Sequence, residues 1–376
     1  MFTNSYKPIS DSGVVNAIES LQFGLSKLKQ DVYVFAPKFP NYKDKQIRIY
    51  RFPSITLPLK VKYPIAIPYS FKISKIIKRI KLDIIHTHHP FNLGVKGAYF
   101  ARKYNIPLVF TNHTKYEDYS HYAPFNQNLT KKIIRCMHKR YLNLCDCVLA
   151  PSTHIKENLL NMGINSRVEV IPNGINFDLI KNSKPTNIRK LYGLKNKKIV
   201  LYIGRLAKEK SIPFIIKAFK LLSKKIKNSV LIIGGSGPEE KNLKKLISDL
   251  QINDKVLMAG KIPHSETIKY YSAASVFVTA SKTEAGPLTV IESLACGVPI
   301  VALKKSNLQD IIKDGKNGFL TNDSLKNFSN KIEELLVDEQ LLKQLSKNAK
   351  KTSHKYNIKN TSRKLLSLYK SLGTIK

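Results

Sequence analysis

The chain has 376 residues, of which 43% are hydrophobic, so it is long enough to form two domains with separate cores. Its 64 lysine and arginine residues against 26 acidic residues give a formal net charge of +38, which excludes a protein of balanced surface charge. Such a charge indicates an anionic partner, either nucleic acid or an anionic membrane surface, unless the lysine excess reflects a compositional bias of the genome.

The four cysteines, Cys136, Cys145, Cys147 and Cys296, lie in apolar or helical contexts and form no zinc-like CxxC pair. A reducing, cytoplasmic compartment is therefore expected. The sequence shows no signal peptide, and no stretch approaches the roughly 20 apolar residues of a membrane-spanning helix. Any membrane contact is expected to come from one side.

The first elements are a short strand at Met1–Thr3, a turn-forming loop at Asp11–Gly13 and an apolar-periodic helix from Val14 to Leu28. A second strand is expected at Asp31–Pro37. Strand and helix alternating in this way predict a doubly wound α/β domain.

The segment Tyr63–Leu82 has the pattern of a basic amphipathic helix. Isoleucines and phenylalanine recur at helical spacing, and Lys72, Lys75, Lys78 and Arg79 lie between them. Two interpretations are open. The helix is either an ordinary surface helix packed on its own sheet or an interfacial helix on anionic lipid, where each basic residue adds about 1 kcal/mol. The segment Asn128–Leu144 has the same character.

Three histidines, His86, His88 and His89, end the strand expected in Asp83–Phe91. Ligand groups gather at the carboxyl ends of strands in α/β folds, so these positions favour a binding site. We do not expect a metal site, because successive strand residues point to opposite faces and metal ligands must converge.

A second buried strand in Leu108–Tyr122 leads into a polar loop, which is either a solvated loop or part of a binding site. The polar side chains of this loop are His113, Lys115, Tyr116, Glu117, Asp118 and His121.

The segment Val168–Asp178 contains a Pro-Asn-Gly turn and indicates an interdomain hinge, followed by a linker to about Leu194. The next domain begins with the strand Ile199–Arg205 and a helix that Pro213 starts. Arg205 and Lys210 bracket the intervening loop, so both can reach one diphosphate and neutralise it without a divalent ion.

A glycine loop follows the strand in Val230–Pro238, and its glycines, Gly234, Gly235 and Gly237, raise the alternative of a dinucleotide site. The spacing is not G-x-G-x-x-G, and no acidic residue closes a strand about twenty residues later, so we disfavour this alternative.

The stretch Ser275–Leu303 holds a buried strand, a short polar loop, a helix and a second strand. Pro287 marks the start of the helix, where the free amides of Leu288 and Thr289 favour an anion. Glu284 precedes the helix and Glu292 lies within it. Carboxylates near such a site suit the hydroxyls of a sugar or ribose.

Glu284 and Glu292, with seven residues between them, resemble the E-x7-E signature of retaining glycosyltransferase family 4, and Gly204–Lys210 resembles its G-R-L-x-x-E-K motif. The resemblance implies the GT-B fold, in which two Rossmann-like domains face a cleft. We expect an N-terminal domain over 1–172 that binds acceptor and membrane, a nucleotide-sugar domain over 173–354, and a helix over 355–376 that crosses back to the first domain.

The resemblance also implies roles for individual residues. Gly13 lets its loop approach the donor phosphates, His113 contacts the transferred sugar, Glu284 holds that sugar and Glu292 holds the ribose. Backbone groups near Ile262 hold the nucleobase. The remaining donor-binding positions are Arg205, Lys210, Gly286, Leu288 and Thr289.

Two departures from the family pattern stand out. Many members have glycine where this chain has Pro287, which puts one backbone contact in doubt. Members also have about five more apolar residues before Phe2. We therefore expect that the start was assigned late, rather than that the sheet lacks half of a central strand.

The loop after His113 resembles that of family members that place a sugar on diacylglycerol. The implied function is transfer of glucose or galactose from a UDP-sugar to 1,2-diacylglycerol, with retained configuration, by a peripheral enzyme at the cytoplasmic membrane face. Tyr116 and Glu117 are the expected acceptor residues, anionic phospholipid the expected surface, and no metal or other cofactor is expected. The alternatives are a phosphatidylinositol or other sugar acceptor and, more remotely, a non-enzymatic nucleic-acid binder, for which the sequence shows no module.

Overall fold

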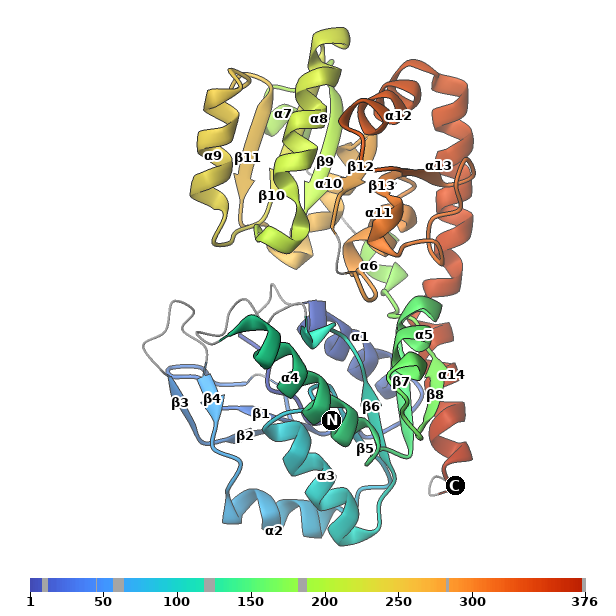
Figure 1. Cartoon of the computed structure of the whole chain (residues 1–376). Helices are drawn as coiled ribbons and strands as arrows, with labels where there is room; N and C mark the ends of the chain where they lie inside the picture. Colours follow the sequence, from blue (N-terminus) through green and yellow to red (C-terminus); the bar gives the residue numbers. More distant parts are fainter. Residues whose placement is uncertain are drawn as a thin grey trace. The chain divides into compact units, whose positions relative to one another are not determined.

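The computed structural model divides into two compact units (Figure 1). The first unit is Met1–Gly174 together with Ile358–Lys376, and the second is Ile175–Asn357. The residues that the structure describes are 1–8, 13–44, 46–56, 64–117, 126–181, 188–281 and 284–373.

The first unit is built on a parallel sheet with a very short segment at its centre. Phe2 bridges Phe35 on one side and Thr87 on the other, and its N–H donates to the His86 carbonyl at 2.8 Å. The strand order is β2-β1, the Met1–Thr3 segment, then β5-β6-β7-β8, with the chain running outward in both directions. The strands are β1 (Val34–Pro37), β2 (Ile49–Phe52), β5 (Ile85–Thr87), β6 (Leu108–Thr111), β7 (Cys147–Ala150) and β8 (Arg167–Val170).

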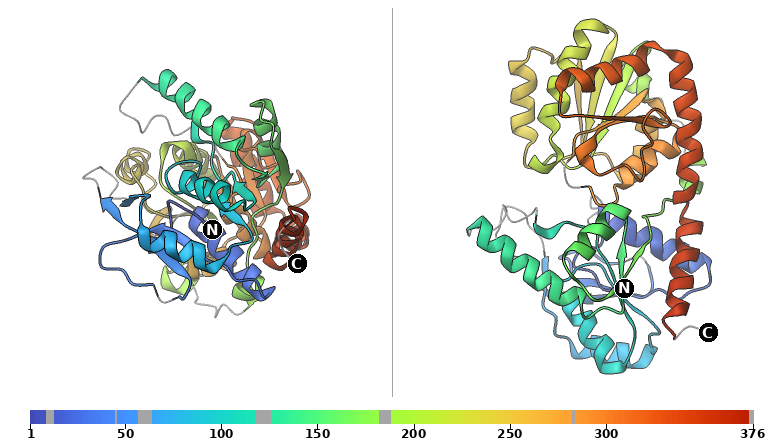
Figure 2. Two further views of the ribbon diagram at one scale, coloured as in Figure 1. Left: turned by 90° about the horizontal axis from the view of Figure 1, so that it is seen from below. Right: turned by 45° about the vertical axis from the view of Figure 1, so that its right-hand side comes forward.

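Helices cover both faces of this sheet. The helices α1 (Gly13–Lys27) and α14 (Ile358–Ser371) pack together on one face and share an apolar core with β1, β6 and β7 (Figure 2). At Gly24 of α1 a side chain would overlap Ser362, so glycine allows this close packing. The opposite face carries α3 (Leu93–Tyr104) and the end of α4 (Gln127–Leu142), and α5 (Thr153–Asn161) packs on β7 and β8.

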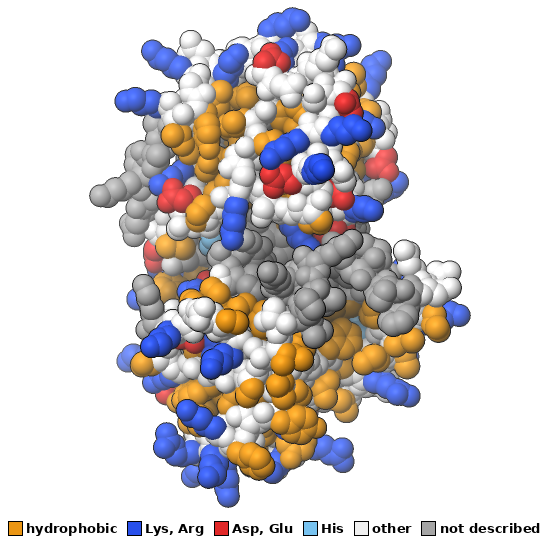
Figure 3. All heavy atoms as spheres, turned by 90° about the vertical axis from the view of Figure 1, so that its left-hand side faces the viewer, with side chains coloured by type: hydrophobic (Ala, Val, Ile, Leu, Met, Phe, Trp, Pro, Cys, Tyr) orange, Lys and Arg blue, Asp and Glu red, His pale blue; other side chains and the backbone are white. Residues whose placement is uncertain are grey.

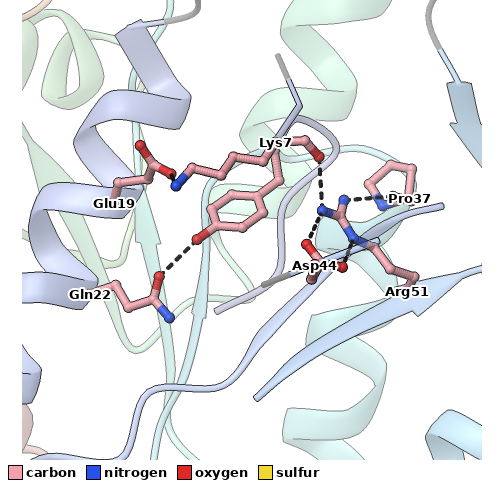
Figure 4. A network of polar contacts seen from close by, with 7 residues as sticks. Lys7, Glu19, Gln22, Pro37, Asp44 and Arg51 are labelled. Carbon is pink, nitrogen blue, oxygen red and sulfur yellow. Dashed lines mark hydrogen bonds and ion pairs between the residues drawn. The ribbon is translucent and has the colours of Figure 1, made fainter. Parts of the chain in front are cut away.

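A partly buried polar network joins the N-terminal segment to the edge of this sheet (Figure 4). The Arg51 guanidinium donates two hydrogen bonds to Asp44, at 2.9 and 2.6 Å, and one each to the carbonyls of Pro37 and Lys7. Next to it, β3 (Ser54–Thr56) pairs antiparallel with β4 (Pro64–Ala66). A planar five-donor group explains why arginine stands at this position.

The second unit contains a six-stranded parallel sheet in the order β11-β10-β9-β12-β13-β14, which is the doubly wound order of a Rossmann fold. The strands are short and almost wholly apolar, and β10, β12 and β13 are buried at every residue, as in a parallel sheet covered by helices on both faces. The strands are β9 (Lys198–Ile203), β10 (Ser229–Gly234), β11 (Val256–Gly260), β12 (Val276–Thr279), β13 (Ile300–Leu303) and β14 (Gly318–Thr321).

The helices of the second unit complete its core. One large apolar cluster joins the sheet to α8 (Ile212–Lys225), α9 (Glu240–Asp249), α12 (Leu325–Val337) and Leu345 of α13 (Glu339–Ser353). Elsewhere in the unit, α10 (Thr267–Ala273) contacts α7 (Ile188–Leu191), β9 and α11 (Leu288–Ala295). The short helices α6 (Phe177–Lys181) and α7 fall within the segment expected to be a linker.

The segment Tyr63–Leu82, expected to be one amphipathic helix, contains a helix that is shorter than its apolar pattern predicted. Only α2, Phe71–Ile80, is helical, and Pro64–Ala66 instead forms β4. The boundary has a local cause, since the Ser70 hydroxyl caps the helix by accepting a hydrogen bond from the Ile73 N–H at 3.3 Å. In the described part of the chain, no helix combines the length and the apolar composition that crossing a bilayer requires.

Candidate active site

In the second unit, the loop after β9 carries Arg205 and ends in the 3-10 turn Lys208–Lys210. The glycine loop after β10 packs against this loop after β9. Gly235 has φ +140°, and a side chain there or at Gly237 would overlap the backbone of the β9 loop. These glycines therefore serve close packing of two loops, which gives a physical reason against the dinucleotide alternative.

Lys210 and Glu284 form an ion pair in this unit. The Lys210 ammonium lies 2.7 Å from Glu284 Oε1 and 3.5 Å from the Ser281 hydroxyl, and the two charged side chains are only 20% and 13% exposed. Burial alone would raise the pKa of Glu284, but the charge and hydrogen bond of Lys210 hold that pKa below its ordinary value. The structure thus brings two predicted site residues together, while the side chain of Arg205 is exposed in the same loop.

The helix α11 begins where the sequence placed it. Pro287 is its N-cap, with an extended ψ of 112°, and Gly297 just beyond the helix has φ +79°. Within the described residues, the N–H groups of Leu288 and Thr289 make no hydrogen bond, so the first turn keeps donors for an anion. Gly286 lies in the half-buried loop between Glu284 and the helix.

Glu292 is buried in α11 and both of its carboxylate oxygens are engaged. Oε1 lies 2.7 Å from His264 Nε2, and Oε2 accepts a hydrogen bond from the Tyr271 hydroxyl at 3.1 Å. The hydrogen bond to Glu292 raises the pKa of His264, although burial acts in the opposite direction. Each oxygen has further acceptor capacity, so this arrangement is compatible with a ribose hydroxyl.

His264 and Tyr271 were not predicted as site residues. They follow β11 at positions that belong to no fixed-spacing motif, and only the fold brings them to Glu292. The half-buried side chain of Ile262 packs on Gly234, where a side chain would overlap it. This contact positions the backbone after β11.

In the first unit, His113 follows β6 and pairs with a second histidine. The rings of His88 and His113 stack with their centroids 5.2 Å apart, and His88 Nδ1 lies 2.9 Å from His113 Nε2. Burial lowers the pKa of His113 to about 3, so this ring is neutral at pH 7. Gly13 is the first residue of α1, and the two loop residues before it, Asp11 and Ser12, lie outside the described residues.

The other loop candidates are only partly described. The Tyr116 ring meets those of Phe91 and His138 edge-on, and Glu117 lies 3.9 Å from Arg135 of α4. The candidates Asp118 and His121, and the rest of the loop to Tyr122, lie outside the described residues.

The other two histidines of the expected strand end, His86 and His89, have separate protein partners. His86 bonds to Thr111 at 2.7 Å and to Tyr369 at 2.6 Å, whereas His89 accepts the Asn4 N–H at 3.2 Å. Among the residues that the structure describes, no three His, Cys, Asp or Glu side chains are grouped to hold a metal ion.

The basic residues predicted on α2 all lie on the surface of the first unit, and they are Lys72, Lys75, Lys78 and Arg79. Ile73 and Ile77 of the same helix are buried, so much of its apolar face packs on the protein. This part of the pattern agrees with an ordinary surface helix.

Comparison with known proteins assigns both units. Residues 12–179 match the family described as Glycosyltransferase Family 4, and residues 183–352 match Glycosyl transferases group 1. An alpha-monoglucosyldiacylglycerol synthase from Acholeplasma laidlawii is 32% identical over 95% of this chain and 92% of the relative. A Streptococcus pneumoniae enzyme of the same name is 33% identical over 85% of this chain and 74% of the relative.

Solved structures agree on the fold. A sucrose-phosphate synthase from Thermosynechococcus elongatus superimposes with a TM-score of 0.82 at 22% identity, covering 99% of this chain and 98% of that one. Anabaena HepE in complex with UDP gives a TM-score of 0.80 at 18% identity, covering 98% of each chain. The predicted GT-B class is thereby confirmed. With both sequence families matched and relatives at 32–33% identity over most of its length, the chain belongs to the family 4 glycosyltransferases and is a nucleotide-sugar-dependent hexosyltransferase.

Proposed function

We propose that this hexosyltransferase moves glucose from UDP-glucose to 1,2-diacylglycerol at the cytoplasmic surface of the membrane, with retained configuration, and so makes monoglucosyldiacylglycerol. The observation that carries the proposal is the 32% identity over 95% of the chain to an enzyme named for that product. Glucose is favoured over galactose because two such relatives carry glucose in their names.

The chemistry of the second unit supports the donor part of the proposal. Lys210 and Arg205 supply positive charge that would neutralise the departing diphosphate, with the free amides of Leu288 and Thr289 as further donors. Glu284 would orient the sugar, and Glu292 the ribose. Charge of this kind does the work that a divalent ion does elsewhere, so activity is expected to persist in EDTA.

We assign the transferred sugar a second contact, His113 of the first unit. Its ring is neutral, so it offers a hydrogen bond rather than a charge. Transfer would proceed on the face from which the diphosphate leaves. Tyr116 and Glu117 are the proposed acceptor residues, because they follow His113 in the same loop.

The surface of the first unit supports a lipid acceptor. On α4, Leu129, Ile133 and Met137 form an exposed apolar stripe, here called the α4 stripe, at helical spacing and 58%, 51% and 51% exposed. Exposed basic residues flank it, including Lys131, Lys132 and Arg135.

Aromatic residues on the same unit add to this surface. Tyr69 and Phe71 at the start of α2 are 76% and 91% exposed, and the Lys96 ammonium lies 5.0 Å from the centre of the Tyr69 ring. Figure 3 shows hydrophobic side chains gathered over the lower, first unit with lysine and arginine around them. Apolar and basic side chains in this combination suit peripheral binding to anionic lipid.

The test is product formation from UDP-glucose and, separately, UDP-galactose, with diacylglycerol in mixed micelles, with and without anionic phospholipid. The proposal expects a glucolipid from UDP-glucose, stimulated by anionic lipid, retained in EDTA and lost in Glu284→Ala. Phosphatidylinositol serves as the competing acceptor. Donor hydrolysis without glycolipid, or transfer to phosphatidylinositol alone, would reject diacylglycerol as the acceptor.

A further inference from the structure

His88 forms a hydrogen bond with His113, and the proposed function uses His113 but gives His88 no role. His88 directly follows β5 and is completely buried, and its Nδ1 lies 2.9 Å from His113 Nε2. Its ring also stacks on His86, with centroids 4.4 Å apart. The orientation of the His88 ring is therefore fixed on both sides.

The buried nitrogen Nε2 of His88 indicates which of the two rings carries the hydrogen of the bond between His88 Nδ1 and His113 Nε2. Among the residues that the structure describes, His88 Nε2 is buried and has no hydrogen-bond partner. If that nitrogen carried the hydrogen, an N–H donor would be buried unpaired, and such orphan donors are rare. The hydrogen therefore belongs on His88 Nδ1, which donates it to His113 Nε2.

The tautomer of His113 follows from this bond. Burial lowers the pKa of His88, with the charges of His86 and His113 acting in the same direction, and burial lowers that of His113 to about 3. Both rings are thus neutral, and a neutral imidazole has one donor and one acceptor nitrogen. Because Nε2 of His113 accepts, its Nδ1 carries the hydrogen. In the described part of the chain that N–H has no partner and is available to a substrate oxygen.

We propose that His88 is a positioning residue for the transfer reaction, which holds the ring plane and tautomer of His113 so that Nδ1–H donates to an oxygen of the transferred sugar. This inference rests on the proposed function, in which His113 contacts that sugar. In metal sites, outer partners that fix the tautomer of a ligating histidine affect affinity or activity about 10- to 100-fold, and we take the same scale for His88.

The experiment compares His88→Leu with His88→Asn in the full chain. Asparagine keeps an N–H donor close to the position of the histidine Nδ1, whereas leucine has none. We expect His88→Leu to lower kcat about 10- to 100-fold with little change in KM for UDP-glucose or in UDP affinity. His88→Asn should recover most of that kcat. Val34→Ala, a core change on β1 of the same sheet, controls for lost stability.

Nitrogen-15 NMR of labelled histidine reads the tautomer without any activity. Resonances are assigned by their loss in His88→Asn and His113→Asn, and the expected state is Nδ1 protonated and Nε2 unprotonated in His113. A hydrogen on His113 Nε2, or an unchanged kcat in His88→Leu, would overturn the inference. Failure of the diacylglycerol acceptor is distinguishable, because UDP-glucose hydrolysis and the NMR spectrum still report the effect of His88.

Discussion

The Lys210–Glu284 ion pair offers a quantitative test of the donor site. In Lys210→Met the Glu284 carboxylate stays buried without its partner, which costs about 3–5 kcal/mol for a fully buried pair. The two side chains keep 20% and 13% exposure, so we scale the expected loss in the second unit to about 2 kcal/mol. The double variant Lys210→Met/Glu284→Gln removes both charges and should recover most of this loss.

The assay is hydrogen exchange by mass spectrometry on peptides from β9 and β12, which reports opening of the second unit alone. A loss of about 2 kcal/mol raises the opening constant about 30-fold. The matched single variant Glu284→Gln should cost less, because the long lysine side chain can turn its ammonium to solvent. Equal destabilisation in Lys210→Met and the double variant would refute the reasoning.

The same variants have a pH signature. The folded pKa of Glu284 lies below its ordinary value, so the pair stabilises the native enzyme above the ordinary carboxyl pKa and loses that effect as the pH falls through the lowered pKa. In Lys210→Met the Glu284 carboxyl group stays buried, and burial without the lysine charge raises its pKa. The difference in stability between native enzyme and variant should therefore shrink as the pH is lowered from 7.5 towards 5.

Four further changes have defined outcomes. Arg51→Lys keeps the charge beside Asp44 but loses the planar fork, and should cost the first unit about 2 kcal/mol in urea unfolding. Gly235→Ala should cost about 3 kcal/mol or more in the second unit, since its φ is +140° and its side chain would overlap backbone. His264→Gln should lose a stability term that is present below the ordinary histidine pKa and vanishes as pH rises through the raised one. Ile133→Ser in the α4 stripe should weaken binding to anionic vesicles in flotation assays.

Two of these changes have a control variant, and the other two have an outcome that would contradict them. Gly193 has a positive φ of +65° and, within the described residues, open space around it, so Gly193→Ala should cost only about 1 kcal/mol. Leu160→Ser, at an exposed apolar position on α5 outside the α4 stripe, should leave vesicle binding unchanged. A loss of stability in His264→Gln that is the same at pH 6 and pH 8.5, or Arg51→Lys at native stability, would contradict the assigned contacts.

Local pattern was enough to predict most of the fold. The apolar strand Ser275–Ala280 and the Pro287 helix start correspond to β12 and α11 within one or two residues, because buried parallel strands and helix caps leave strong local signals. The amphipathic pattern from Tyr63 overestimated the length of α2. Apolar spacing continued upstream, but a serine cap and a strand begun by Pro64 decided the boundary.

The site was harder to predict because its contacts join residues far apart in the sequence. Lys210 and Glu284 were both expected to bind the donor, yet no spacing indicates that they pair directly. His264 carries no motif and reaches Glu292 only through the fold. For His88, strand alternation shows that it shares a face with His86, but its bond to His113 requires the register of β5 against β6.

The place of α14 in the first unit has a consequence for biosynthesis. Its Leu365 and Tyr369 complete the apolar cluster formed with α1, although the whole second unit lies between the two helices in the sequence. The ribosome therefore finishes the second unit while Val15 and Ile18 of α1 still lack their covering helix. The first unit therefore exposes apolar surface while the second unit is being synthesised. Protection by chaperones during translation is most needed in this period.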